Sequence, residues 1–157
     1  MRFAGLSAAV IALVLASGSA AYANSTSETI VRAFKEICVD HAPSFQSHKV
    51  KASFQKVGKA KFPTGSGAFL SVVPAQSCRI HLDGIPLNAD GSEPDVSLAL
   101  EKQIITELAR RVGGEVSVYR KGKRNESWSV KVGRSKYRLQ SIYKKRRQSW
   151  GLTLYKS

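Results

Sequence analysis

The chain has 157 residues, 43% of them hydrophobic, and its 25 Lys and Arg against 11 Asp and Glu give a formal net charge of +14. This length is typical of one domain and is sufficient to bury a hydrophobic core. Beyond the N-terminal apolar run, no stretch reaches the roughly 18 apolar residues that a membrane-spanning helix needs, which argues against a transmembrane segment in the rest of the chain.

The first 23 residues have the pattern of a secretory signal peptide. Arg2 supplies a positive charge, Leu6 to Ala16 form an apolar run, and Ala21-Tyr22-Ala23 has the small-residue spacing of a cleavage site. A retained signal anchor is the alternative, and the cleavage site directly after the apolar run argues against it. The sequence therefore predicts a signal peptide over residues 1–23 and a single domain over residues 24–157, located in the periplasm or secreted.

Cys38 and Cys78 are the only cysteines of the chain. In an oxidising compartment the natural prediction is that they form a disulfide bond. Such a bond would close a loop of about 40 residues, for which the chain-entropy model gives about 4 kcal/mol of stabilisation. A thiolate nucleophile or a metal ligand is the alternative, and the absence of a Cys-x-x-Cys spacing argues against it.

A first helix is predicted to begin after Ser25 and to end near His41. Ser25, with Glu28 three residues later, matches a capping box. Pro43 disfavours helical geometry at the residue before it and so sets the end of the helix. Apolar residues recur at helical spacing along this segment and predict a face packed against a core: Ile30, Phe34, Ile37 and Cys38.

A second helix is predicted from Phe45 to about Val57, with Ser44 as its N-cap and Gly58 at its end. The glycine-rich segment Gly65-Ser66-Gly67 follows it. A phosphate-binding loop needs a strand before such a segment and a helix after it, whereas here a predicted strand follows. We therefore interpret this segment as a turn.

Two short strands come next, Ala68–Val73 and Cys78–Leu82, and the turn-forming residues between them predict a hairpin. Alternation along the second strand places Arg79, His81 and Asp83 on the face away from the core. His81 and Asp83 are then neighbours and are expected to form a hydrogen-bonded pair. Acid–base catalysis would also require a nucleophile or a substrate beside them, so a polar surface pair is the preferred interpretation.

A third helix is predicted from Ser92 to Val112, ended by Gly113-Gly114. After it, apolar residues alternate along four strands whose connections are short enough for antiparallel neighbours: Glu115–Arg120, Ser127–Val132, Lys136–Tyr143 and Ser149–Tyr155. The predicted fold class is α+β. We expect a two-layer single domain, with three helices packed on an antiparallel sheet that ends in a four-stranded meander, in the order ααββαββββ.

The C-terminal third, Gly114–Ser157, contains thirteen Lys and Arg but only two acidic residues, a net charge of +11. The first and third turns of the meander are its most basic connections, and in a meander these two turns lie at the same end of the sheet. We expect them to form one anion-binding patch from Arg120, Lys121, Lys123, Arg124, Lys144, Lys145, Arg146 and Arg147. The alternative is that the charges only keep the protein soluble and protect the sheet edges.

No metal or cofactor site is expected. The three histidines, His41, His48 and His81, do not have the spacing of a metal site, and the cysteines are expected to be paired. The anionic partners that fit an exported protein are lipopolysaccharide, anionic lipids, acidic glycans and the acidic surface of another protein. Nucleic acid is also compatible with the charge, but the sequence has no recognised nucleic-acid-binding motif.

The arrangement of these elements resembles a loose family of small exported proteins of alphaproteobacteria. The resemblance rests on the signal peptide, on Phe34-x-x-x-Cys38, on the turn Ala42-Pro43-Ser44-Phe45, and on Cys78 at the start of a strand before a helix and a terminal meander. It implies an exported protein with a Cys38–Cys78 bond and implies no activity. The basic C-terminal third is not part of the resemblance.

The leading hypothesis is a non-enzymatic periplasmic binding or envelope-associated module that docks an anionic partner through its basic C-terminal sheet. Two alternatives stay open. One is a small exported hydrolase with a site near Gly65–Gly67 and His81/Asp83, and the other is an accessory or inhibitor subunit of a protein complex. An inhibitor of a basic enzyme would need an acidic surface, so the charge argues against that kind of target.

Overall fold

The computed structural model of the chain describes residues 18–63, 66–88, 90–121 and 125–157. Over these residues the helices are α1 (Gly18–Cys38), α2 (Ser47–Lys61) and α3 (Leu98–Val112). The strands are β1 (Ala68–Val73), β2 (Ser77–Leu82), β3 (Glu115–Lys121), β4 (Asn125–Val132), β5 (Ser135–Lys144) and β6 (Ser149–Lys156). Two short 3-10 helices follow α1 and β5, namely η1 (Val39–His41) and η2 (Lys145–Arg147).

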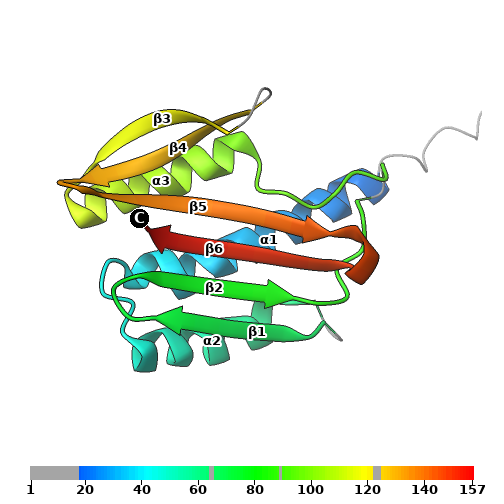
Figure 1. The fold of residues 1–157 in the computed structure, drawn as a ribbon. Coiled ribbons are helices and arrows are strands. Elements are labelled where there is room, and N and C mark those ends of the chain that lie inside the picture. Colours follow the sequence, from blue (N-terminus) through cyan, green and yellow to red (C-terminus); the bar gives the residue numbers. More distant parts are fainter. Residues whose placement is uncertain (1–17, 64–65, 89, 122–124) are drawn as a thin grey trace, which may run out of the picture.

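All six strands belong to one antiparallel sheet in the order β1-β2-β6-β5-β4-β3 (Figure 1). The last four strands form the predicted meander. The β1–β2 hairpin extends it because β2 pairs with the C-terminal strand β6, from Ser77 opposite Tyr155 to Leu82 opposite Trp150. This non-local pairing turns a hairpin and a meander into a single sheet.

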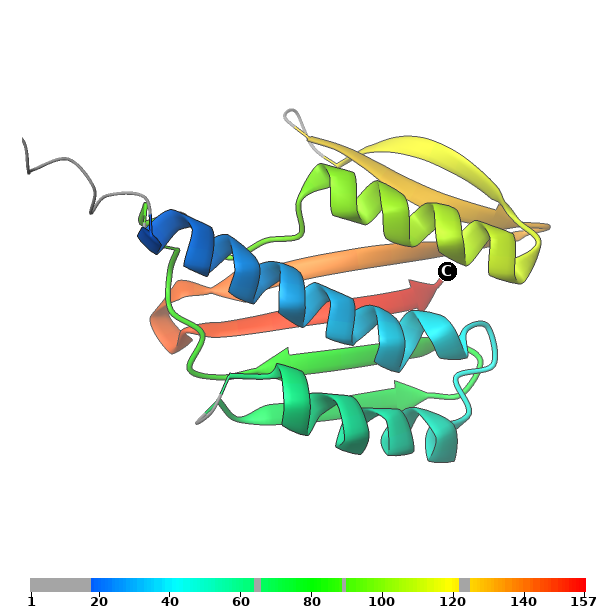
Figure 2. The same ribbon diagram turned by 180° about the vertical axis from the view of Figure 1, so that it is seen from behind.

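The three helices lie on the same face of this sheet, as Figure 2 shows from behind. α2 packs near β1, α1 contacts α2 and β2, and α3 packs on β4 and β5. The other face, toward the viewer in Figure 1, carries no described helix, and we call it the open face. The predicted two-layer α+β architecture is therefore confirmed. No described helix is both long enough and apolar enough to cross a lipid bilayer.

The core lies between the helices and the sheet, and the alternation of the strands decides which side chains enter it. Along β2, Cys78, Ile80 and Leu82 are buried, and along β6, Leu152 and Leu154 are buried. Burying one large aliphatic side chain is worth about 1.5–3 kcal/mol, so this stripe fixes which face of each strand turns toward the helices.

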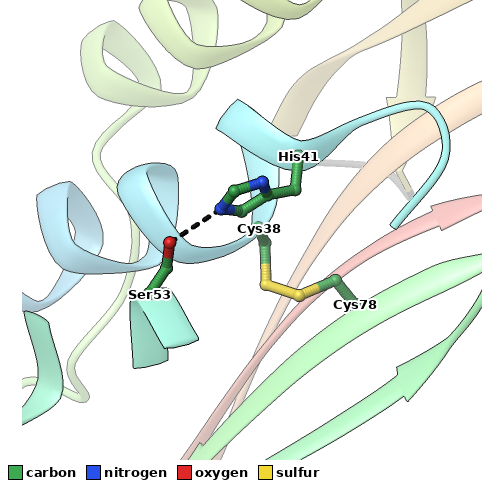
Figure 3. The surroundings of a disulfide bond; sticks show 4 residues. All are labelled: Cys38, His41, Ser53 and Cys78. Atoms are coloured by element: carbon green, nitrogen blue, oxygen red, sulfur yellow. Dashed lines mark hydrogen bonds between the residues drawn. A yellow bond between two sulfur atoms is a disulfide. The ribbon is translucent and has the colours of Figure 1, made fainter. Parts of the chain in front are cut away.

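The predicted disulfide joins Cys38 at the end of α1 to Cys78 in β2, with a Cα–Cα distance of 5.5 Å (Figure 3). Both cysteines are fully buried in the core. The bond therefore ties the helix layer to the sheet. No described cysteine is left free for nucleophilic or metal chemistry.

Two predicted helix starts are wrong. α1 begins at Gly18 rather than after Ser25, because the alanine-rich residues before Ser25 have high helix propensity and extend the helix backward. α3 begins at Leu98, where the Ser97 hydroxyl accepts the Leu100 N–H at 3.3 Å. Ser92 belongs instead to a turn, since its N–H and hydroxyl donate to one Asp90 carboxylate oxygen at 2.9 and 2.6 Å.

The second helix is also shifted from its predicted position. α2 runs from Ser47 to Lys61 and continues through Gly58, which was expected to end it. A single glycine inside a helix costs only about 1 kcal/mol, and here it makes room for Phe62, whose ring would lie 3.0 Å from a Cβ at Gly58. The helix ends instead before Phe62 and Pro63, where the proline restricts the residue that precedes it.

The end of α3 and all four strands of the meander follow the prediction closely. Gly113 ends α3 in the left-handed conformation, with φ of 67°. At Gly114 a Cβ would lie 2.6 Å from Val130 and 2.7 Å from the Lys131 carbonyl, so only glycine allows β3 to approach β4 here. Each strand of the meander begins and ends within two residues of its expected limits.

Candidate anion-binding surface

The ion pairs of the described Lys and Arg residues lie in the layer formed by α1, η1, α2 and α3, which we call the helix layer. They are Arg32–Glu28 at 2.6 Å, Lys35–Asp40 at 3.6 Å, Lys35–Glu107 at 3.0 Å, Arg111–Asp40 at 3.0 Å, and Lys61–Glu36. In this layer acidic residues neutralise Arg32, Lys35, Lys61 and Arg111.

Lys35 shows how tightly some of these charges are held. Its partial burial lowers its pKa, but the hydrogen bond and charge of Glu107 and the charge of Asp40 more than compensate, so its pKa is raised. Arg111 adds a second cation to Asp40 and also donates to the Asp40 carbonyl at 2.9 Å. The pairs link α1 and η1 to α3 and have a structural role.

In contrast to Lys35, the basic residues of the connection between β5 and β6 have no acidic partner among the described residues. Lys144 ends β5 and Lys145, Arg146 and Arg147 form η2, and all four side chains are exposed. We call these four residues the β5–β6 tip. Within the part of the chain that the structure describes, no acidic side chain forms an ion pair with any of them. The β5–β6 tip is therefore a local excess of four positive charges.

The other predicted basic connection is described only in part. The backbones of Arg120 and Lys121 end β3, whereas Lys123 and Arg124 lie outside the described residues. β4 pairs with β5 from Ser129 to Val132, and Figure 1 shows β4 diverging from β5 toward the N-terminal end of β4. That the two basic connections act as one patch stays a prediction.

The open face of the sheet carries further cations. Strand alternation places on it Arg79 of β2, Lys136 and Arg138 of β5, and Lys131 of β4. The acidic Glu115 is the neighbour of Lys131 across the edge strands β3 and β4. Strand alternation in the sequence predicts Arg79 on this face, but only the β2–β6 pairing brings it beside the basic C-terminal strands.

The predicted His81–Asp83 pair is present, with 3.1 Å between His81 Nε2 and Asp83 Oδ1. The Asp83 N–H donates to the Gly67 carbonyl at 2.8 Å, so the described end of the glycine-rich turn lies beside this pair. The Ser66 hydroxyl donates to the Pro63 carbonyl at 2.7 Å and not to His81. Among the described residues, no hydroxyl or thiol is hydrogen-bonded to His81.

The other histidines do not add a second site. His41 makes a 2.7 Å hydrogen bond between its Nε2 and the Ser53 hydroxyl beside the disulfide (Figure 3), and burial lowers its pKa. His48 is exposed on α2. In the described ranges no group of three or more His, Cys, Asp or Glu residues is arranged to hold a metal ion.

Two hollows of the described surface lie in the helix layer. One of about 410 Å³ is lined by α1, the segment before α3, and α3, including Val31, Asp95 and Leu100. A smaller one of about 220 Å³ continues along α1 and α3 past Lys35 and Glu107. Both lie on the opposite side of the sheet from His81, so they do not provide a substrate pocket for the His81–Asp83 pair.

Comparison with family models, with curated proteins and with solved structures finds no match to this chain. The charge distribution over the two layers is therefore the main guide to function. It favours an anion-binding surface formed by the β5–β6 tip and the sheet around it.

Proposed function

We propose that the protein is an exported, non-enzymatic module, located in the periplasm or secreted, that binds an anionic partner through its basic C-terminal sheet. The observation that supports this most is the unequal pairing of charge. In the helix layer Arg32, Lys35, Lys61 and Arg111 have acidic partners and the cations without one are spread along α2 and α3, whereas the β5–β6 tip has four adjacent exposed cations with none among the described residues.

Clustered cations without acidic partners repel one another, and a bound anion relieves that repulsion. Their attraction for phosphate, sulfate or carboxylate weakens as salt screens it, over about 10 Å at 0.1 M ionic strength. Suitable partners are lipopolysaccharide, anionic lipid headgroups, acidic glycans and acidic protein surfaces.

Export is supported by the signal-peptide pattern of residues 1–23, by the resemblance to small exported alphaproteobacterial proteins, and by the Cys38–Cys78 disulfide, a bond typical of oxidising compartments. Mass spectrometry of the protein recovered from the periplasm of a bacterial host tests this directly. We expect a chain that begins at Asn24 and has no free thiol. A cytoplasmic protein with an intact N-terminus would contradict export.

Binding is tested with the full chain expressed for export and purified in oxidised form. It is presented to lipopolysaccharide, anionic vesicles, a sulfated glycan and a polyuronate in a salt series. A tip variant carries Lys144→Gln, Lys145→Gln, Arg146→Gln and Arg147→Gln. A control variant removes four exposed cations of the helix layer that have no ion pair among the described residues: Lys49→Gln, Lys51→Gln, Lys56→Gln and Lys102→Gln.

We expect salt-sensitive binding to at least one of these polyanions, at least about tenfold weaker in the tip variant and little changed in the control. Equal losses in the two variants would mean that only net charge matters. No binding to any polyanion at low salt would contradict the proposed function.

A hydrolase is the second candidate, and the 3.1 Å contact between His81 and Asp83 is the observation that favours it. A carboxylate that orients a histidine is one part of an acid–base site, but a nucleophile or an activated water is also needed. Ester, phosphoester and glycoside substrates would be tested against the protein and against His81→Ala. Turnover that is lost in the variant would support an enzyme in place of a binding module.

A further inference from the structure

On the open face, Gly151 of β6 has no side chain, and it is buried beside Arg79 and His81 of β2. A Cβ at this position would lie 3.4 Å from Arg79 Nη2 and 3.7 Å from His81 Nδ1. The guanidinium of Arg79 and the imidazole of His81 therefore both border the space that a side chain at position 151 would take. A larger residue at position 151 would displace them.

The two groups differ in what they contact on their other sides. His81 uses Nε2 to contact Asp83 at 3.1 Å, so its other nitrogen, Nδ1, is the one beside Gly151. Arg79 is exposed and makes no hydrogen bond or ion pair with any residue that the structure describes. Its guanidinium is thus seated on the sheet while its N–H donors have no described acceptor.

The sheet register surrounds this pair with two kinds of side chain. Thr153 of β6 is the cross-strand neighbour of Arg79, and Gln140 of β5 follows Thr153 in the same row, so hydrogen-bonding residues continue the row of the guanidinium. Phe69 of β1 and Ile142 of β5 end the row of His81 and Gly151.

These two apolar side chains are 59% and 43% exposed, on a face that no described helix covers. Phe69 and Ile142 are three strands apart, about 14 Å at the usual strand spacing. We call the set the Arg79 strip: Phe69, Arg79, His81, Gln140, Ile142 and Thr153 around Gly151.

We propose that the Arg79 strip binds the acidic sugar residues of a glycan, with a uronate carboxylate on the Arg79 guanidinium. The planar guanidinium matches the two oxygens of a carboxylate and donates to both. Gln140 and Thr153 supply partners for sugar hydroxyls, and Phe69 and Ile142 offer apolar contact to the C–H faces of sugar rings. The strip extends across β1, β2, β6 and β5, which suits a polymer chain.

This proposal names the partner class of the proposed function and rests on that function. Lipid and protein partners fit the strip less well. To bind an anionic lipid, the protein would need larger apolar side chains that insert into the bilayer. Gln140 and Thr153, which can hydrogen-bond to sugar hydroxyls, would then have no ligand group to contact. The glycan would contact the β5–β6 tip through charge alone and the Arg79 strip through shape and hydrogen bonds.

The test is titration of the oxidised, exported protein with an oligogalacturonate, followed by calorimetry at fixed salt. Arg79→Gln removes the guanidinium. Gly151→Val removes no charge but displaces Arg79 and His81. Arg134→Gln is the matched control, since it removes an exposed cation from the β4–β5 turn.

We expect Arg79→Gln and Gly151→Val each to weaken binding at least about tenfold, as the loss of a charge-assisted hydrogen bond predicts, and Arg134→Gln to weaken it less than about threefold. The carboxyl-reduced, neutral form of the same oligosaccharide should not bind. Circular dichroism and thermal unfolding check that the variants are folded. Gly151→Ala, whose Cβ makes only an ordinary contact with Arg79, serves as a milder variant.

Three results would overturn the inference: equal effects of Arg79→Gln and Arg134→Gln, wild-type affinity in a folded Gly151→Val, or equal binding of the neutral oligosaccharide. Loss of vesicle binding in Arg79→Gln without any loss of oligogalacturonate binding would assign the strip to lipid and also overturn it. If the tip variant alone loses binding, the proposed function stands and this inference fails. If no polyanion binds, both fail.

Discussion

The helix layer and the open sheet use their charges differently. In the helix layer, Asp40 and Glu107 hold Lys35 and Arg111 in ion pairs that connect α1 and η1 to α3. On the sheet side, the β5–β6 tip has no acidic partner among the described residues, and the exposed Arg79 lies beside Gly151. The first arrangement stabilises the fold, and the second leaves positive charge available to a ligand.

In a chain of net charge +14, this difference indicates which basic residues are candidates for binding a partner. Judged by total charge alone, every basic residue would be an equal candidate for binding an anionic partner. Pairing separates the residues whose charge is already neutralised from those whose charge is not. Substitutions at the ion-paired residues of the helix layer should therefore change stability, and substitutions at the β5–β6 tip should change binding.

The largest effect on stability is expected from the bond that joins the two layers. Replacing Cys38 and Cys78 together by alanine removes a cross-link over 40 residues and should lower the free energy of unfolding by about 4 kcal/mol. Urea denaturation of the two proteins measures this difference. A change below about 1 kcal/mol would show that packing alone holds α1 on the sheet.

A smaller loss is expected when one acid of the helix layer is neutralised. Asp40→Asn breaks contacts with both Lys35 and Arg111, which are only partly exposed, and should lower the free energy of unfolding by about 1 kcal/mol. Binding to polyanions should not weaken. Chemical denaturation and binding measured on the same preparation check both statements, and weaker binding would contradict the separation of roles.

The opposite result is expected at the β5–β6 tip. Arg146→Gln removes one of four adjacent positive charges, so it should leave the free energy of unfolding unchanged or raise it by a few tenths of a kcal/mol. The same substitution should weaken polyanion binding measurably. Destabilisation by more than about 1 kcal/mol would mean that this side chain supports the fold.

The smallest effect concerns pH. Burial lowers the pKa of His41 below its ordinary value of 6.5, with Lys49 and Arg111 acting in the same direction and Asp40 opposing them. The unfolded chain therefore takes up the proton first as pH falls. Stability from the neutral ring is complete above about pH 6.5 and is lost as pH falls through that value toward the lower folded pKa.

His41→Gln should flatten this dependence, because glutamine does not titrate and its side chain can still form a hydrogen bond with Ser53. Thermal unfolding between about pH 7 and pH 5.5 compares the two proteins in the window where histidine titrates. Parallel curves for the two proteins would exclude His41 as the source of the dependence.

Local patterns were sufficient to predict most of the sheet. Alternating apolar residues such as Leu152 and Leu154 define strands almost residue by residue, because a shift of one position would expose the whole buried stripe. Alternation also placed Cys78 on the buried side of its strand and His81 beside Asp83. Helix starts were harder, since Ser25 and Ser92 are good capping residues that the surrounding chain does not use as caps.

Contacts between distant segments were beyond local patterns. Nothing near Arg79 in the sequence shows that β2 pairs with β6, so its position over Gly151 could not be anticipated. The partner of Arg111 could not be anticipated either. Glu107, four residues before it on the same helix, is the nearby acid in the sequence, but Arg111 contacts Asp40, which is 71 positions away. Pairings of this kind depend on how the elements pack, and these pairings decide which cations are left for a partner.

The most direct test of the account is the salt dependence of polyanion binding in the wild type, the tip variant and the helix-layer control variant. The slope of log affinity against log salt counts the ions released, at about 0.7–0.9 per cation that contacts the partner. If the β5–β6 tip is the contact surface, the tip variant should lose about 3 units of slope and the control should keep the wild-type slope. Equal slopes in the two variants would contradict the claim that unpaired charge on the sheet side, and not charge in general, binds the partner.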